Sequence, residues 1–154
     1  MAIVLPNGIL GNPGEKMEWV RSWMLWNMEL LASVDLPGEA FLPQVSVQAS
    51  CVFLRRRSPT ETMNLGPDRP AQRPVFMAIA EACGHGRRGE KTWVKSPDGQ
   101  EEIFQEPVRE RWEKEGEIKE RVRLKSLKKL DDDMPWIAEQ YRRHVAGQGF
   151  EGER

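Results

Sequence analysis

The order of apolar segments in the first 57 residues most constrains what this chain can fold into. Residues 2–5 form a continuous apolar run that predicts a buried strand, and residues 6–8 predict a Pro-Asn-Gly turn after it. Apolar residues at helical spacing predict a helix over 15–28 (Met17, Val20, Met24, Met28). Residues 30–37 and 48–54 predict a second and a third strand. The order strand, helix, strand, strand predicts an α/β fold.

The remainder of the chain is divided by turn signals. Residues 58–74 hold four prolines and predict a loop, and residues 75–83 predict a short apolar helix that ends at Gly84. Residues 92–104 predict a β-hairpin, because two apolar stretches flank Ser-Pro-Asp-Gly. Residues 105–154 predict a charged helical tail.

The last helix of this tail has its own boundary signals. Asp133 is suited to the N-cap position, Pro135 to the first turn, and Gly147 to the position past the end. We therefore divide the chain into residues 1–104, which hold the predicted strands and the hairpin, and residues 105–154, which form the charged helical tail.

Composition limits the classes of function. The net charge is −1, so any contact with DNA must come from a local basic patch. Cys51 and Cys83 lie in apolar contexts that suit reduced thiols in a cytoplasmic protein. The first residues do not have the basic-then-apolar pattern of a leader, and no apolar run approaches the ~20 residues that span a bilayer, so we expect no membrane partner.

These segments together resemble a known family. Leu-Pro closes the first two predicted strands, and residues 41–46 lead into the third. This arrangement resembles the C-terminal half of the catalytic domain of N-6 adenine-specific DNA methyltransferases, and most closely the modification subunit of type I restriction-modification systems. Residues 75–89 and the Asp-rich stretch before the last helix extend the resemblance to about residue 146.

The resemblance implies a partial Rossmann-like sheet of an S-adenosylmethionine-dependent methyltransferase. Its three strands would be mixed: the first two parallel, with the third inserted between them and antiparallel to both. Helices would cover the faces, and a β-hairpin and a helical C-terminal tail would follow.

Two motifs of that family do not occur in this sequence. They are the glycine-rich cofactor turn and the Asn-Pro-Pro-aromatic motif that holds the target amine; Asn12-Pro13 is followed by Gly14 and predicts only a loop. We therefore expect a fragment or split piece of the enzyme that has no catalytic residue of its own. It would be inactive alone and would not bind S-adenosylmethionine tightly. The alternatives are a non-catalytic binding or assembly module that pairs with a methyltransferase subunit, and an unrelated α/β domain.

The resemblance also implies residues of a target-base pocket. An aromatic residue at the position of Phe41 stacks on the extruded adenine in related enzymes, and stacking of this kind contributes ~1–3 kcal/mol. Pro6, Asn7 and Gly8 would form a wall of this pocket, because the carboxyl ends of strands line the ligand crevice of open α/β sheets. The alternatives are that Phe41 is an ordinary core residue and that Asn7-Gly8 only makes a turn.

Basic and polar residues are candidate contacts to the DNA backbone, although short charge runs are often only solvated surface. The candidates are Gln44, Ser46, Arg55, Arg56, Arg57, Arg87, Arg88 and Lys91. We expect no metal site, because Cys83 with His85 lacks a second ligand pair and Asp131 to Asp133 suits a helix cap. The expected partners are DNA, the missing half or a companion methyltransferase subunit, and the specificity subunit.

The sequence also predicts exposed apolar surface. The resemblance implies a strand paired on both sides, but the family's neighbour on its other side does not occur in this sequence. The first strand would therefore be an edge, and an unprotected one, since residues 2–5 contain neither charge nor proline. Trp19, Trp23 and Trp26 form a second apolar stripe on the first predicted helix.

Overall fold

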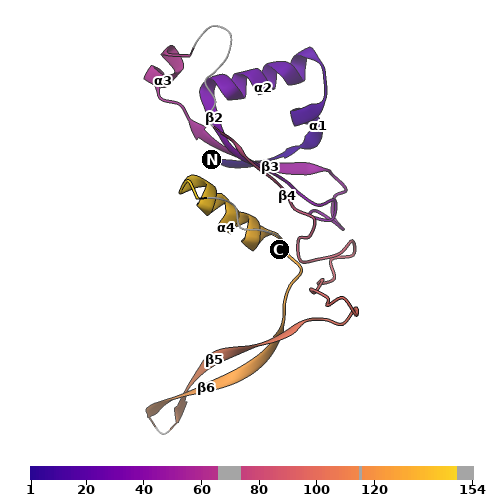
Figure 1. Ribbon diagram of the computed structural model, residues 1–154, viewed down its shortest axis with the longest axis vertical. Coiled ribbons are helices and arrows are strands. Elements are labelled where there is room, and N and C mark those ends of the chain that lie inside the picture. The colour runs from indigo at the N-terminus through magenta and orange to yellow at the C-terminus, as the bar shows by residue number, and fades with distance from the viewer. Residues whose placement is uncertain (66–73, 115, 149–154) are drawn as a thin grey trace.

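The computed structural model describes residues 1–65, 74–114 and 116–148, which form a four-stranded mixed sheet, a two-stranded hairpin and helices (Figure 1). In chain order the elements are β1 (Ala2–Pro6), α1 (Asn7–Gly11), α2 (Glu15–Asn27), β2 (Met28–Asp35), β3 (Ala49–Arg56), α3 (Pro59–Met63), β4 (Phe76–Ile79), β5 (Ile103–Lys114), β6 (Glu117–Lys128) and α4 (Met134–Val145).

The sheet has the strand order β1-β3-β2-β4. β3 pairs antiparallel with β1 on one side and with β2 on the other, so β1 and β2 run parallel. This confirms the expected arrangement of the first three strands. The fourth strand, β4, was not expected, and it pairs parallel with the outer side of β2.

Helices lie on both sides of the sheet, with α2 on one side and α4 on the other (Figure 1). The α4 side holds the main core, in which Ile137 of α4 packs against buried residues of the sheet and of the segment that follows β4. The core residues from those segments are Ala32, Val34, Phe76 and Ala80. The α2 side is more open, because no α2 residue is fully buried.

The predicted helix over residues 75–83 is wrong, since residues 76–79 form β4. Phe76 is buried and Met77 is 69% exposed, which is the alternation of a strand. A short run of apolar residues shows neither the spacing typical of a helix nor that of a strand. Its conformation is therefore decided by its pairing with β2. Gly84 has a φ of +80° but ends no helix.

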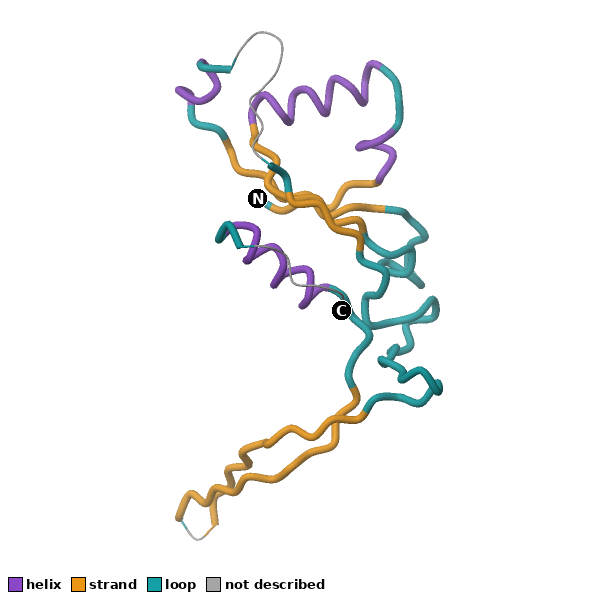
Figure 2. Tube along the Cα trace, in the orientation of Figure 1, coloured by secondary structure: helices purple, strands orange, loops and turns teal. Residues whose placement is uncertain are grey.

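The predicted helical tail is also wrong over most of its length. Residues 103–114 and 117–128 pair in register along their whole length as β5 and β6, and this hairpin projects from the rest of the molecule (Figure 2). In β6 every odd-numbered residue from 117 to 125 is charged, and Ile118, Val122 and Leu124 lie at even positions, a period-two pattern that suits a strand. The predicted hairpin over 92–104 has its turn at 96–99, but only Lys95 and Glu101 bridge across it.

Two smaller expectations are corrected at β1 and at the 58–74 loop. Residues 7–11 form the short helix α1 in place of a simple Pro-Asn-Gly turn. Within the predicted loop, residues 59–63 form α3, which begins with a capping box between Ser58 and Glu61. Residues 66–73 of that loop lie outside the described residues.

The last helix begins and ends as predicted, with Asp133 at the N-cap, Pro135 in the first turn and Gly147 past the end. The Asp133 carboxylate makes no cap hydrogen bond. It instead accepts from the backbone nitrogens of Glu81 (2.7 Å) and Ala82 (2.8 Å), just after β4. Asp132 accepts from the backbone nitrogen of Met134. Asp133 therefore ties α4 to the sheet.

Arg55 links β2, β3 and α3. Its Nε donates to Glu29 and its Nη2 to Glu61, both at 2.7 Å. The hydrogen bond from Arg55, followed by that from the Ser58 backbone nitrogen, lowers the pKa of Glu61 from 4.5 to about 2. We expect this stabilisation to be complete above pH 4.5 and to be lost as the pH falls toward 2, because the folded-state pKa is the lower one.

This pH dependence is measured by carboxyl carbon NMR of Glu61. The resonance is expected to titrate near pH 2 in the native chain and at a higher pH in the Arg55→Gln variant, which keeps only the hydrogen bonds with Ser58. A resonance that titrates near pH 4.5 in the native chain would contradict the lowered pKa of Glu61 and the hydrogen bonds that cause it.

Candidate functional site: a polar cluster beside an apolar cavity

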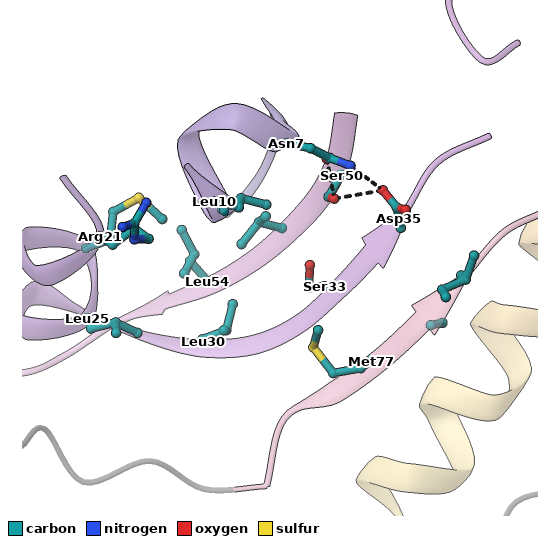
Figure 3. A pocket seen from close by; sticks show the side chains of 15 residues that line it. Asn7, Leu10, Arg21, Leu25, Leu30, Ser33, Asp35, Ser50, Leu54 and Met77 are labelled. Carbon is teal, nitrogen blue, oxygen red and sulfur yellow. Dashed lines mark hydrogen bonds between the residues drawn. The ribbon is translucent and has the colours of Figure 1, made fainter. Parts of the chain in front are cut away.

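Three polar side chains meet at one edge of the sheet. Asn7 Nδ2 donates to Asp35 Oδ1 at 2.9 Å. Ser50 Oγ lies 2.8 Å from Asn7 Oδ1 and 3.1 Å from Asp35 Oδ1 (Figure 3). Ser50 is buried, and Asn7 and Asp35 are half-buried. Because a serine hydroxyl has one proton, Ser50 donates to only one of the two acceptors at a time.

The strand directions bring this cluster together. Asn7 follows the last residue of β1, and Asp35 is the last residue of β2. Since β1 and β2 are parallel, their carboxyl ends lie at the same edge. Ser50 lies near the start of the antiparallel strand between them and pairs with Asp35 in register. The carboxyl edge of parallel strands is where open α/β sheets bind ligands.

A cavity of about 880 Å³ extends from this cluster between the sheet and α2. Its other walls are mainly apolar. They include Met24 and five residues labelled in Figure 3: Leu10, Leu25, Leu30, Leu54 and Met77. Its size is within the range of small-molecule sites. Arg21 also lines it, with Nη1 donating to the backbone oxygens of Ile9 and Asn12. An apolar pocket with one convergent polar cluster suits a small ligand with an apolar body and a hydrogen-bonding group.

Of the predicted base-pocket residues, Asn7 lies in this site and Pro6 and Gly8 flank it. Phe41 does not line the cavity; it is half-buried in the connection between β2 and β3. Sequence reasoning missed Asp35 and Ser50. Asp35 could have been found because it is a polar residue at the end of a predicted strand. It was instead interpreted only as one of the polar residues that alternate with apolar residues along that strand.

The predicted DNA contacts fall into two groups at opposite ends of β3. Arg87 Nε donates to Glu39 Oε1 at 3.2 Å, which brings the 85–91 turn beside the connection that holds Phe41. Arg88 and Lys91 in that turn are exposed, as are Gln44 and Ser46 in the connection. Arg55, Arg56 and Arg57 follow β3 to its other end, about 20 Å from Ser50 at the usual rise per residue.

The three consecutive arginines do not form one exposed patch. Arg57 is 8% exposed, and its Nε donates to the backbone oxygen of Leu25. Arg55 is held by Glu29 and Glu61. Arg56 is exposed. The geometry thus gives Arg55 and Arg57 structural roles and makes Arg56 the accessible member of the group.

No family profile, curated protein or solved structure matches this chain. Among the described residues, no group of three or more His, Cys, Asp or Glu is arranged to hold a metal ion. Cys51 and Cys83 are free and partly buried, and burial raises the pKa of the Cys51 thiol. No helix in the described part of the chain is long and apolar enough to cross a membrane.

Proposed function

We propose that this chain is part of an adenine-specific DNA methyltransferase of a type I restriction-modification system. It forms one wall of the target-base pocket and part of the DNA-facing surface. S-adenosylmethionine and the motif that grips the target amine belong to the complete enzyme outside this sequence. The partners are DNA, the remainder of the catalytic domain and the specificity subunit, in the cytoplasm.

The observation that carries this proposal is the insertion of antiparallel β3 between parallel β1 and β2. This arrangement was expected only from the resemblance to the methyltransferases, because the sequence pattern does not specify pairing. The hydrogen bond between Asn7 and Asp35 at the carboxyl edge of the parallel pair also supports the proposal, because open α/β sheets bind ligands at that edge.

The chemistry of the cluster supports the same proposal. A base extruded from the duplex is read by hydrogen bonds to its edge and by apolar or aromatic contacts to its faces. Asn7 and Asp35 supply an amide and a carboxylate for the edge, and the apolar cavity beside them accommodates a planar ring. Phe41 lies in the segment that continues from β2, at the same end of the sheet.

The second candidate is a non-catalytic assembly module that pairs with a methyltransferase subunit. Exposed apolar residues on β1, β4 and α2 favour a protein partner: Val4 is 47% exposed, Ile79 74% and Trp19 67%. β1 is an edge strand of the sheet among the described residues. Unprotected apolar edges and patches of this kind mark partner sites.

Co-expression with the polypeptide encoded immediately upstream distinguishes the two candidates. The readout is transfer of labelled methyl groups from S-adenosylmethionine to adenine in DNA. We expect no transfer and no tight cofactor binding by this chain alone, and transfer by the pair. Asn7→Ala and Asp35→Ala in the pair should lower transfer while the two chains still copurify. A pair that copurifies without activity supports the assembly module, and a micromolar cofactor isotherm for the isolated chain contradicts the first proposal.

Phe41→Ala is expected to lower methyl transfer by the complete enzyme about tenfold to a hundredfold. The reason is that loss of one base–aromatic stack removes ~1–3 kcal/mol. The thermal unfolding midpoint of this chain should change little, because Phe41 is only half-buried and lies in a loop. Unchanged activity, or an unfolded variant, identifies Phe41 as a packing residue.

A further inference from the structure

The β5–β6 hairpin carries a row of basic side chains on one face. Residues opposite each other in an antiparallel pair share a face, and alternate residues of a strand share a face. The register therefore puts four basic residues of β6 on the face that also holds Trp112 of β5: Lys119, Arg121, Arg123 and Lys125. The row is about 20 Å long at the usual rise per residue.

Arg121 of this row is held by contacts within the hairpin, whereas the side chains of the other three residues are exposed. Arg121 Nε donates to Glu110 Oε2 at 2.6 Å, and its Cζ lies 5.3 Å from the centre of the Trp112 ring. Lys119, Arg123 and Lys125 are exposed, and none has an ion-pair partner among the residues that the structure describes. Glu106, opposite Lys125, and Glu110 are the acidic residues of β5 on this face.

The other face of the hairpin is different. It holds exposed apolar residues, including Ile118, Val122 and Leu124. Two of its basic residues are engaged, since Arg111 pairs with Glu120 and Lys128 with Glu101. Two hairpins packed through this face would bury only about 800 Å² in total, less than the ~1,000 Å² expected of a stable interface. A second copy is therefore a poor occupant.

We propose that the β5–β6 hairpin is an arm that binds the phosphate backbone of duplex DNA through Lys119, Arg123 and Lys125, with Arg121 held between them. A two-stranded ribbon has dimensions that fit the major groove. β6 carries five Lys or Arg against two Glu, so this strand is locally basic although the whole chain has a net charge of −1. The hairpin projects away from the sheet, which leaves this face open to a duplex (Figure 1). DNA binding by this arm does not depend on methyltransferase activity.

The test compares two variants that lose the same number of charges from the same hairpin. The first is K119Q/R123Q/K125Q on the basic face, which leaves Arg121, Glu110 and Trp112 in place. The matched control is R109Q/R111Q/K128Q on the opposite face. The full chain and both variants are titrated against a labelled 24-base-pair duplex from 50 to 200 mM salt, and binding is followed by fluorescence anisotropy. Circular dichroism establishes that each variant is folded.

We expect the first variant to bind at least about tenfold more weakly at 50 mM salt. The slope of log affinity against log salt should become less steep by about 3, roughly 1 for each phosphate contact removed. The control should stay within about threefold of the native chain. If both variants lost the same amount of affinity, the effect would be one of net charge alone. If both variants bound as tightly as the native chain, the hairpin would not contact DNA. Either result, or no binding by the native chain, overturns the proposal. Because no cofactor or methyl transfer enters the assay, its failure leaves the proposed function untouched.

Discussion

Phe76→Ala is expected to lower the free energy of unfolding by about 3–5 kcal/mol, the usual loss for a large aromatic side chain removed from a core. Phe76 is 5% exposed and lies in the cluster formed with Ala32, Val34 and Ile137. Its ring packs edge-on to Tyr141, with centroids 5.5 Å apart. Since folded proteins are stable by only about 5–15 kcal/mol, this one change removes much of the stability.

Met77→Ala is the matched control, because Met77 is the next residue of β4 and points to the opposite face. It is 69% exposed, so its truncation should change the free energy of unfolding by no more than about 0.5 kcal/mol. Urea titration followed by circular dichroism measures both variants. Equal losses would contradict the alternation of β4 and with it the packing of α4 on this strand.

Asp133→Ala is expected to cost about 3 kcal/mol. Asp133 is 5% exposed, and its carboxylate accepts the backbone nitrogens of Glu81 and Ala82. Hydrogen bonds to a charged group contribute about 1.5–3 kcal/mol each, and the variant leaves two backbone donors near the core without this acceptor. The change therefore acts on the connection between β4 and α4.

Asp132→Ala is the comparison for that variant. Its carboxylate accepts from the Met134 backbone nitrogen at the start of α4, and loss of such a cap typically costs about 1 kcal/mol. If Asp133 acted only as a helix cap, as its position in the sequence suggests, the two variants would be equally destabilised in urea. The structure predicts that Asp133→Ala is the more damaging by about 2 kcal/mol.

The sequence predicted elements whose signals are local. The helix over 15–28 has a repeating apolar spacing, and α2 spans Glu15–Asn27. The last helix has a cap residue, a proline and a glycine at the expected places, and α4 starts after Asp133. The first three strands were also found, because each is an apolar run bounded by turn residues. The pairing of these strands was predicted only from the resemblance to a known family.

Errors arose where local signals were ambiguous or where a partner decided the conformation. Residues 76–79 are apolar in any interpretation, and only the pairing with β2 makes them a strand. Residues 105–128 were assigned to a charged helical tail, whereas the pairing of β5 with β6 makes this segment a hairpin.

The sequence predicted one residue of the candidate site, and the tertiary structure added the others. The sequence by itself determined that Asn7 follows a strand, because a proline and a glycine bracket it after an apolar run. Only the tertiary structure decided that Asp35 and Ser50 join it, since the three residues are brought together by a parallel pair of strands with an antiparallel strand between them. Asn7 lies 28 positions from Asp35 and 43 positions from Ser50 in the sequence. Hydrogen bonds over such separations depend on strand order and register, and neither is encoded in the local pattern of one segment.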